Sequence, residues 1–227
     1  MHNFQIYFLL FLTYSCLGWI MEVIVTYPDT KKFVNRGFLI GPYCPIYGYS
    51  SIIMIFYLNH YKDNPLTVFL LAVVVCSFIE YMVSYIMEKM FHARWWDYSK
   101  HKFNLNGRIC LSNCLAFGVL GFLLIKFMNP FFFKIYSALS IKTINILFYT
   151  LITIFIIDSI ISFNTIFKIK NLSIKYKNLD NTSEIKDKIK KMFYKNYLSK
   201  RIFKASPEFH KEIRRRFEDF IQKIENK

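Results

Sequence analysis

The chain is poor in acidic residues and in glycine. Its 227 residues include 15 Asp and Glu against 30 Lys and Arg, which gives a net charge of +15, and only 7 residues are glycine. No stretch has the form Gly-x-x-x-x-Gly-Lys-Ser/Thr, which excludes a phosphate-binding loop of that type. No histidine or second cysteine pair joins the 5 cysteines at metal-ligand spacing. We therefore expect no metal site and no cofactor in this chain.

Long apolar runs dominate what is present. Hydrophobic residues make up 54% of the chain, and a helix needs about 20 mostly apolar residues to cross the hydrocarbon layer. The first run lacks the basic n-region of a cleaved signal, so we interpret it as a retained span. The sequence predicts an all-α polytopic membrane protein with five transmembrane helices, at about residues 4–27, 37–61, 66–91, 109–128 and 144–167.

Basic residues are distributed unevenly among the expected loops. With the C-terminus inside, the cytoplasmic loops contain eight Lys and Arg and the outer loops contain four. The segment before the first run contains none. Because basic loops tend to stay in the cytoplasm, we expect the N-terminus outside the cell and the C-terminus inside.

The C-terminal part of the chain is basic and amphipathic. Residues 166–227 contain 18 Lys and Arg against 8 Asp and Glu. Apolar residues recur at helical spacing over 185–197 and 207–224, and Ser206 followed by Pro207 is a typical helix start. We interpret residues 1–167 as a transmembrane domain and 168–227 as a cytoplasmic helical tail. The tail would lie on the membrane surface, dock to a partner or pack on the protein's own loops.

Three acidic residues lie inside apolar runs and open the same short pattern. Glu22, Glu80 and Asp158 are each followed by two residues, a β-branched aliphatic residue, Ser or Thr, and an aromatic ring. A carboxylate in a membrane span is costly, which makes it a candidate functional residue. By helical rise all three should lie at a similar depth, in the cytoplasmic half, with Glu88 two turns beyond Glu80.

Two arginines begin the expected returning helices. Arg36 follows Asn35 and precedes Gly37, while Arg108 closely follows Asn106. We expect these arginines to pair with the buried acids, because buried charges persist when they are paired. The shared motifs also favour two parallel hairpin repeats, at about 4–61 and 66–128. The cluster would form a polar pocket that binds an ion or a charged headgroup, or it would only fix helix packing.

Two irregular segments accompany these charges. Residues 37–48 contain prolines that disfavour helix, so we expect a bent entry or a re-entrant turn, with an ordinary proline kink as the alternative. The loop at 92–98 suits an aromatic belt at the interface, or a gate or headgroup-binding loop. The residues expected to shape the pocket are Gly37, Gly41, Pro42, Tyr43, Pro45 and Tyr47, and those of the loop are Arg94, Trp95, Trp96, Asp97 and Tyr98.

These residues resemble the hallmark motifs of the ABC-transporter type IV permease family of low-GC Gram-positive bacteria. The resemblance rests on residues 33–48, Glu80 with Glu88, residues 94–99 and residues 106–110, and it covers roughly residues 4–130. It implies a multi-pass protein of the bacterial cell membrane. Because the chain has no phosphate-binding loop, the resemblance also implies a separate nucleotide-binding ATPase subunit.

Three functions follow from this sequence. The leading hypothesis is the membrane subunit of a transporter in which the buried acids and arginines form a cytoplasm-facing site, alone or as a homo-oligomer. The second is a membrane-embedded enzyme acting on a lipid or isoprenoid headgroup, with carboxylates, tyrosines and arginines for acid–base work. The third is a non-catalytic assembly or sensory protein. Besides the bilayer and an ATPase, we expect no nucleic-acid partner, because no recognised binding module is visible.

Overall fold

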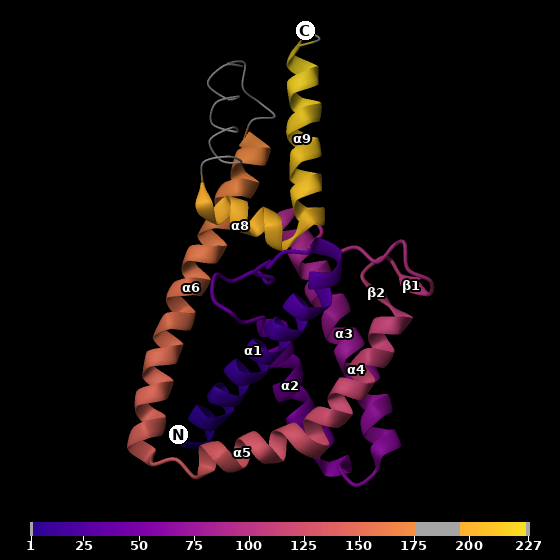
Figure 1. The fold of residues 1–227 in the computed structure, drawn as a ribbon. Helices are drawn as coiled ribbons and strands as arrows, with labels where there is room; N and C mark the ends of the chain where they lie inside the picture. The colour runs from indigo at the N-terminus through magenta and orange to yellow at the C-terminus, as the bar shows by residue number, and fades with distance from the viewer. Residues whose placement is uncertain (1, 176–195, 226–227) are drawn as a thin grey trace.

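Helices make up almost all of the architecture (Figure 1). The computed structural model describes residues 2–175 and 196–225. The helices are α1 (His2–Thr30), α2 (Pro45–Leu58), the 3-10 turn η1 (Asn59–Tyr61), α3 (Pro65–Phe91), α4 (Leu111–Leu123), the π-helical turn η2 (Leu124–Met128), α5 (Asn129–Ser137), α6 (Ile141–Lys175), α8 (Tyr197–Ala205) and α9 (Pro207–Glu225). Two short antiparallel strands, β1 (Asn104–Leu105) and β2 (Ile109–Cys110), join α3 to α4.

Four helical stretches are long and apolar enough to cross a membrane: Asn3–Pro28, Pro65–Phe91, Leu111–Ser137 and Ile141–Asn171. The chain is therefore an all-α polytopic membrane protein. The expected second span is instead the 14-residue helix α2, about 21 Å long at the rise of an α-helix. Since this is short of the ~30 Å hydrocarbon layer, the fifth span stays a prediction.

Three helix boundaries differ from those expected. Helix α1 continues through Pro28 to Thr30 and ends where Lys31 takes a left-handed conformation with φ 50°. The helix that begins at Leu111 continues through η2 into α5. Pro130 does not interrupt it, because proline is tolerated in the first turn of a helix. Helix α6 runs through the expected domain boundary at residue 167 as far as Lys175. Apolar character marks the membrane-spanning part of a helix, while helical hydrogen bonding continues into polar sequence.

The termini of α3 and α9 carry clear start signals. The side chain of Asn64 accepts a hydrogen bond from the Thr67 amide at 3.2 Å, and Pro65 follows it. Ser206 accepts from the Phe209 amide at 3.2 Å, so α9 begins at the Ser–Pro pair where a helix start was expected. The expected apolar positions at 185–193 lie outside the described residues.

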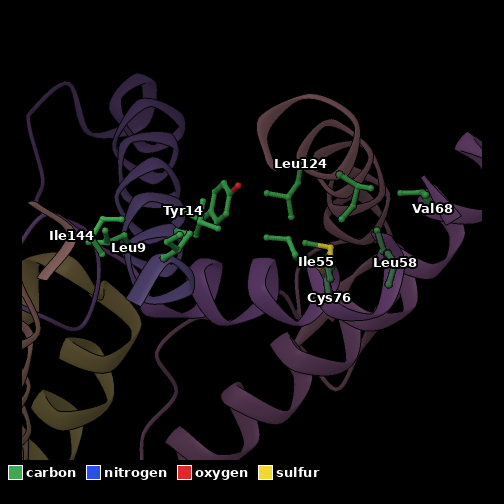
Figure 2. Close-up of a cluster of buried hydrophobic side chains, with 13 residues drawn as sticks. Leu9, Tyr14, Ile55, Leu58, Val68, Cys76, Leu124 and Ile144 are labelled. Atoms are coloured by element: carbon green, nitrogen blue, oxygen red, sulfur yellow. Dashed lines mark hydrogen bonds between the residues drawn. The ribbon is translucent and has the colours of Figure 1, made fainter. Parts of the chain in front are cut away.

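One apolar core holds the transmembrane helices together. Side chains from α1, α2, α3, η2 and α6 meet there (Figure 2). Its labelled members are Leu9, Tyr14, Ile55, Leu58, Val68, Cys76, Leu124 and Ile144. Helix α1 packs mainly against α2, and α3 mainly against α4. These are the pairs expected of two hairpins, while the duplication of residues 4–61 and 66–128 stays a prediction.

A second apolar core lies under the C-terminal helices. In Figure 1, α8 crosses the end of the bundle opposite the N-terminus, and α9 projects away from it. Ile202, Phe203, Phe209 and Ile213 are buried there against side chains from the end of α3 and from α6, among them Phe91, Ala93, Ile166 and Ile169. Residues 196–216 therefore pack on the protein itself.

Candidate functional site

Asp158 of α6 is bound by the irregular segment that precedes α2. Its carboxylate accepts hydrogen bonds from the amides of Ile40 at 2.9 Å and Gly41 at 2.7 Å. It also accepts from the hydroxyls of Tyr43 at 2.5 Å and Ser162 at 2.9 Å. Four donors from the protein replace the water that a buried carboxylate would otherwise lose. Asp158 thus fixes residues 40–43 against α6.

The segment that donates to Asp158 is itself anchored to α1. The indole of Trp19 donates to the side-chain oxygen of Asn35 at 2.8 Å, and the Asn35 amide group donates to the Ile40 carbonyl at 2.8 Å. The Cys44 amide donates to the Ser15 carbonyl at 2.9 Å. Gly37 has φ 102°, a conformation that favours glycine. Residues 35–44 therefore form a non-helical bridge between α1 and α6, and Pro45 begins α2 directly after it.

Glu22 and Glu80 each have polar partners of their own, away from Asp158. Glu22 accepts a hydrogen bond from the Tyr47 hydroxyl at 2.6 Å and lies 3.7 Å from Nε of Arg36. Glu80 of α3 accepts a hydrogen bond from the Tyr98 hydroxyl at 3.2 Å. Oε2 of Glu80 is buried and has no hydrogen-bond partner among the described residues. This buried oxygen of Glu80 is open to a further donor.

Arg108 pairs with Glu88 rather than with Glu80. Its guanidinium lies 2.8 Å from Oε2 of Glu88 and over the ring of Tyr85, 5.3 Å from its centroid. Arg94 lies 3.2 Å from the same Glu88 oxygen and 3.5 Å from Asp97. The expected acid–arginine pairing thus occurs two helical turns away from Glu80. Glu88 lies nearer the C-terminal end of α3, and Arg108 of the strand hairpin reaches that end.

The two tryptophans of the aromatic loop contact other segments of the protein. Trp95 packs between Phe38 and Phe209, with ring centroids 5.7 and 5.5 Å away. The indole of Trp96 donates to the Arg108 carbonyl at 3.0 Å. The loop therefore holds the bridge, the tail and the start of α4 together, and its role as an interfacial belt or gate stays a prediction.

Two titratable loop residues are shifted in opposite directions. Hydrogen bonds from the side chain and amide of Ser99 lower the pKa of Asp97 below its usual value. Burial, reinforced by the charge of Glu80, raises the pKa of Tyr98. Tyr98 thus remains a neutral donor to Glu80. Asn106, expected in the site, is exposed and donates to the Tyr81 hydroxyl at 3.0 Å instead.

The structure adds two residues of the tail, Arg201 and Ser206, whose contacts with the bridge and the aromatic loop the sequence did not predict. The buried Arg201 of α8 points at the carbonyls of Gly37 and Phe38, each 3.5 Å from its Nη2. The Ser206 hydroxyl donates to the Trp95 carbonyl at 2.5 Å. Arg36 of the bridge also donates a hydrogen bond to the Ala205 carbonyl at the end of α8, at 2.6 Å. Arg201 lies between the two amphipathic stretches expected at 185–197 and 207–224, and the sequence indicated neither its helix nor its partners on the bridge.

The Arg108–Glu88 pair offers a direct test of the charged cluster. A double-mutant cycle with Arg108→Gln and Glu88→Gln is expected to give a coupling of about 1–2 kcal/mol, since the pair is close and partly shielded from water. The measurement is the unfolding free energy in detergent. The control is Lys126→Gln with Asp63→Asn, a pair 3.9 Å apart whose side chains are 43% and 83% exposed. That pair should couple by less than about 0.5 kcal/mol, and equal couplings would contradict the prediction.

The approach of Tyr47 to α1 depends on Gly18. A Cβ added there would lie 2.3 Å from Cγ of Tyr47, too close for any side chain. Gly18→Ala is therefore expected to destabilise the protein by about 1–3 kcal/mol through overpacking, measured by thermal unfolding. In a Tyr47→Gly background, which removes Cβ, Cγ and Cδ2 of residue 47 together, the same change should cost almost nothing. A full cost in that background would show that the strain lies elsewhere.

Comparisons with known proteins give one match. The family model described as "Putative ABC-transporter type IV" matches residues 9–163, a stretch that includes Glu22, Glu80, Asp158 and the whole bridge but not α8 or α9. No curated protein and no solved structure matches the chain.

Proposed function

Because the chain belongs to the "Putative ABC-transporter type IV" family, we propose that it is the membrane subunit of a transporter. Its place would be the bacterial cell membrane, with five spans, the N-terminus outside and the C-terminus inside. Positive loops and the basic tail support this orientation. A homo-oligomer would suit this role as well as a single chain.

One observation carries the proposal: polar contacts run inside the bundle from α6 through the bridge to α1. Asp158 holds Gly41, Arg36 of the same bridge lies beside Glu22, and Tyr47 at the start of α2 donates a hydrogen bond to Glu22. Ionisable groups retained in membrane spans usually mark substrate or ion pathways. These residues would form a polar site open to the cytoplasm, and Glu80 would provide its free acceptor.

The bridge would act as the movable part of this site. Non-helical backbone at membrane depth is tolerated where it is enclosed by protein or lines a water-filled path, and transporters use such interrupted segments at their binding sites. Gly41 and Pro42 contribute to the irregular course of the bridge, and Pro45 ends it at the start of α2. The contacts of Arg36 and Arg201 with α8 and the bridge would pass bridge motion to the tail.

Energy would come from a separate subunit. The chain has no phosphate-binding loop of the Gly-x-x-x-x-Gly-Lys-Ser/Thr type, so an ATPase partner would have to bind at its cytoplasmic end. Helix α9 projects from that end (Figure 1) and provides a surface for such a partner.

The test combines purification with ATP hydrolysis. The full chain is purified from its native membrane after cross-linking, and partners are identified by mass spectrometry. We expect an ATPase with its own phosphate-binding loop. Reconstituted in liposomes, the complex should hydrolyse ATP, and Glu80→Gln should reduce this at least tenfold. Gln has nearly the shape of Glu, so folding should survive.

Asp63→Asn is the matched control, because it removes one carboxylate from an exposed loop position. It should leave hydrolysis unchanged. Absence of any nucleotide-binding partner would overturn the transporter-subunit proposal. An ATPase partner whose rate of ATP hydrolysis is unchanged by Glu80→Gln would contradict the polar site but not the role as a transporter subunit.

A further inference from the structure

A cavity of about 290 Å³ opens at the end of α3 next to the tail, lined by Tyr85, Glu88, Lys89, His92, Arg108 and Arg216. Three chain segments build it. Helix α3 and the residue after it supply four lining residues, Arg108 comes from the strand hairpin, and Arg216 comes from α9. Its volume is enough for a phosphate group with its glycerol.

Positive charge exceeds negative charge in this cavity. Lys89, Arg108 and Arg216 face it, and Glu88 is the only carboxylate among its described lining residues. Glu88 is already bound by Arg108 and by Arg94 from outside the cavity. Arg216 is held by Glu212 at 3.0 Å, which offsets part of its charge, and also donates to the His92 carbonyl.

Among the described residues, no ion-pair partner of Lys89 is present. Its ammonium lies over the ring of Tyr85, 5.6 Å from the centroid, a contact that leaves its hydrogen-bond donors open. Arginine and lysine together are the usual ligands of phosphate oxygens, arginine through its fork and lysine as a point charge. The lining therefore suits an anion with several oxygens.

The surface below the cavity is apolar and exposed. Val74 is 64%, Phe78 65% and Ile86 47% exposed, and they lie on α3, which is one of the four stretches able to span a membrane. Their spacing places them along one side of α3 that leads up to the cavity. Acyl chains of the bilayer would lie along this stripe, directly under the basic groups.

We propose that this cavity binds the phosphate group of an anionic phospholipid. The headgroup would sit among Lys89, Arg108 and Arg216, with its acyl chains along the α3 stripe. Basic pockets at the end of transmembrane helices are suited to such headgroups. Because Arg216 belongs to α9 and Lys89 to α3, the lipid would also tie the tail to the transmembrane part. The proposal does not depend on the transporter role.

Native mass spectrometry of the purified full chain tests it by titration with phosphatidylglycerol, phosphatidylcholine or inorganic phosphate. We expect phosphatidylglycerol to bind at least tenfold more tightly than either of the others. Lys89→Gln and Arg216→Gln should each weaken it about fivefold, the usual effect of one basic group near a phosphate surface.

Arg215→Gln is the matched control. Arg215 is the neighbour of Arg216, also lies 3.0 Å from a Glu212 oxygen, and its side chain is 68% exposed outside the cavity. Its substitution should leave lipid binding unchanged. Equal binding by wild type and by the Lys89→Gln/Arg216→Gln double variant would overturn the site. Inorganic phosphate binding as tightly as phosphatidylglycerol would overturn the lipid as its ligand. Lys89 is exposed on α3, so its substitution should not impair folding.

Discussion

Asp158→Ala is expected to lower the thermal-unfolding midpoint in detergent by about 10 °C. The substitution leaves the amides of Ile40 and Gly41 and the Tyr43 hydroxyl without their common acceptor. Each donor left unpaired in the interior costs about 1–3 kcal/mol. For a chain of this size, each 1 kcal/mol shifts the midpoint by about 2–4 °C. Differential scanning fluorimetry of the purified variant measures the effect.

Ser159→Ala is the control for this prediction. Ser159 is the next residue of α6, and its hydroxyl donates a hydrogen bond to the Phe155 carbonyl of the same helix at 2.7 Å. Its loss should move the midpoint by about 2 °C or less, since such a bond adds little to helix stability. If both variants unfold within about 2 °C of wild type, the carboxylate does not hold the bridge to α6.

Phe209→Ala is expected to release the tail from the bundle. Phe209 is fully buried against Trp95 and Phe203, and truncating such a ring costs about 3–5 kcal/mol. If this cost falls on the docking of α8 and α9, the open state becomes at least about 100-fold more populated. Hydrogen–deuterium exchange of amides at 197–213 should then accelerate by at least about 100-fold, while amides of α3 keep their protection.

Lys211→Ala gives the comparison, because Lys211 lies two residues further along α9 and is exposed. An exposed substitution of this kind changes stability by about 0.5 kcal/mol at most, so exchange in 197–213 should remain near that of wild type. Uniform acceleration in both the tail and α3 would contradict the prediction, since it would mean that the tail does not open as a separate unit.

The sequence predicted the transmembrane helices well where apolar residues filled a whole helix length. The spans expected at 66–91 and 144–167 lie inside α3 and α6, because a long apolar segment has few stable alternatives to a helix in a bilayer. Prolines were less informative. Pro45 begins α2 as its pattern allows, whereas Pro28 lies inside α1.

The sequence did not predict which groups pair with the buried acids and arginines. Arg108 was expected beside a deeply buried acid and pairs with Glu88, while Asp158 is bound by backbone amides and hydroxyls. Backbone donors have no sequence signature of their own, because every residue except proline carries one. The sequence also could not predict that α8 contacts the bridge, since the carbonyls near Arg201 lie more than 160 positions away in the chain.

Composition and periodicity alone thus determined that this is a helical membrane protein with acids in its spans, because the cost of exposing polar backbone to lipid leaves the chain little choice. Only the tertiary structure decided which donors surround each acid, how short α2 is, and that the tail packs on the bundle. These outcomes depend on contacts between distant segments, whose geometry is fixed only when the helices pack together.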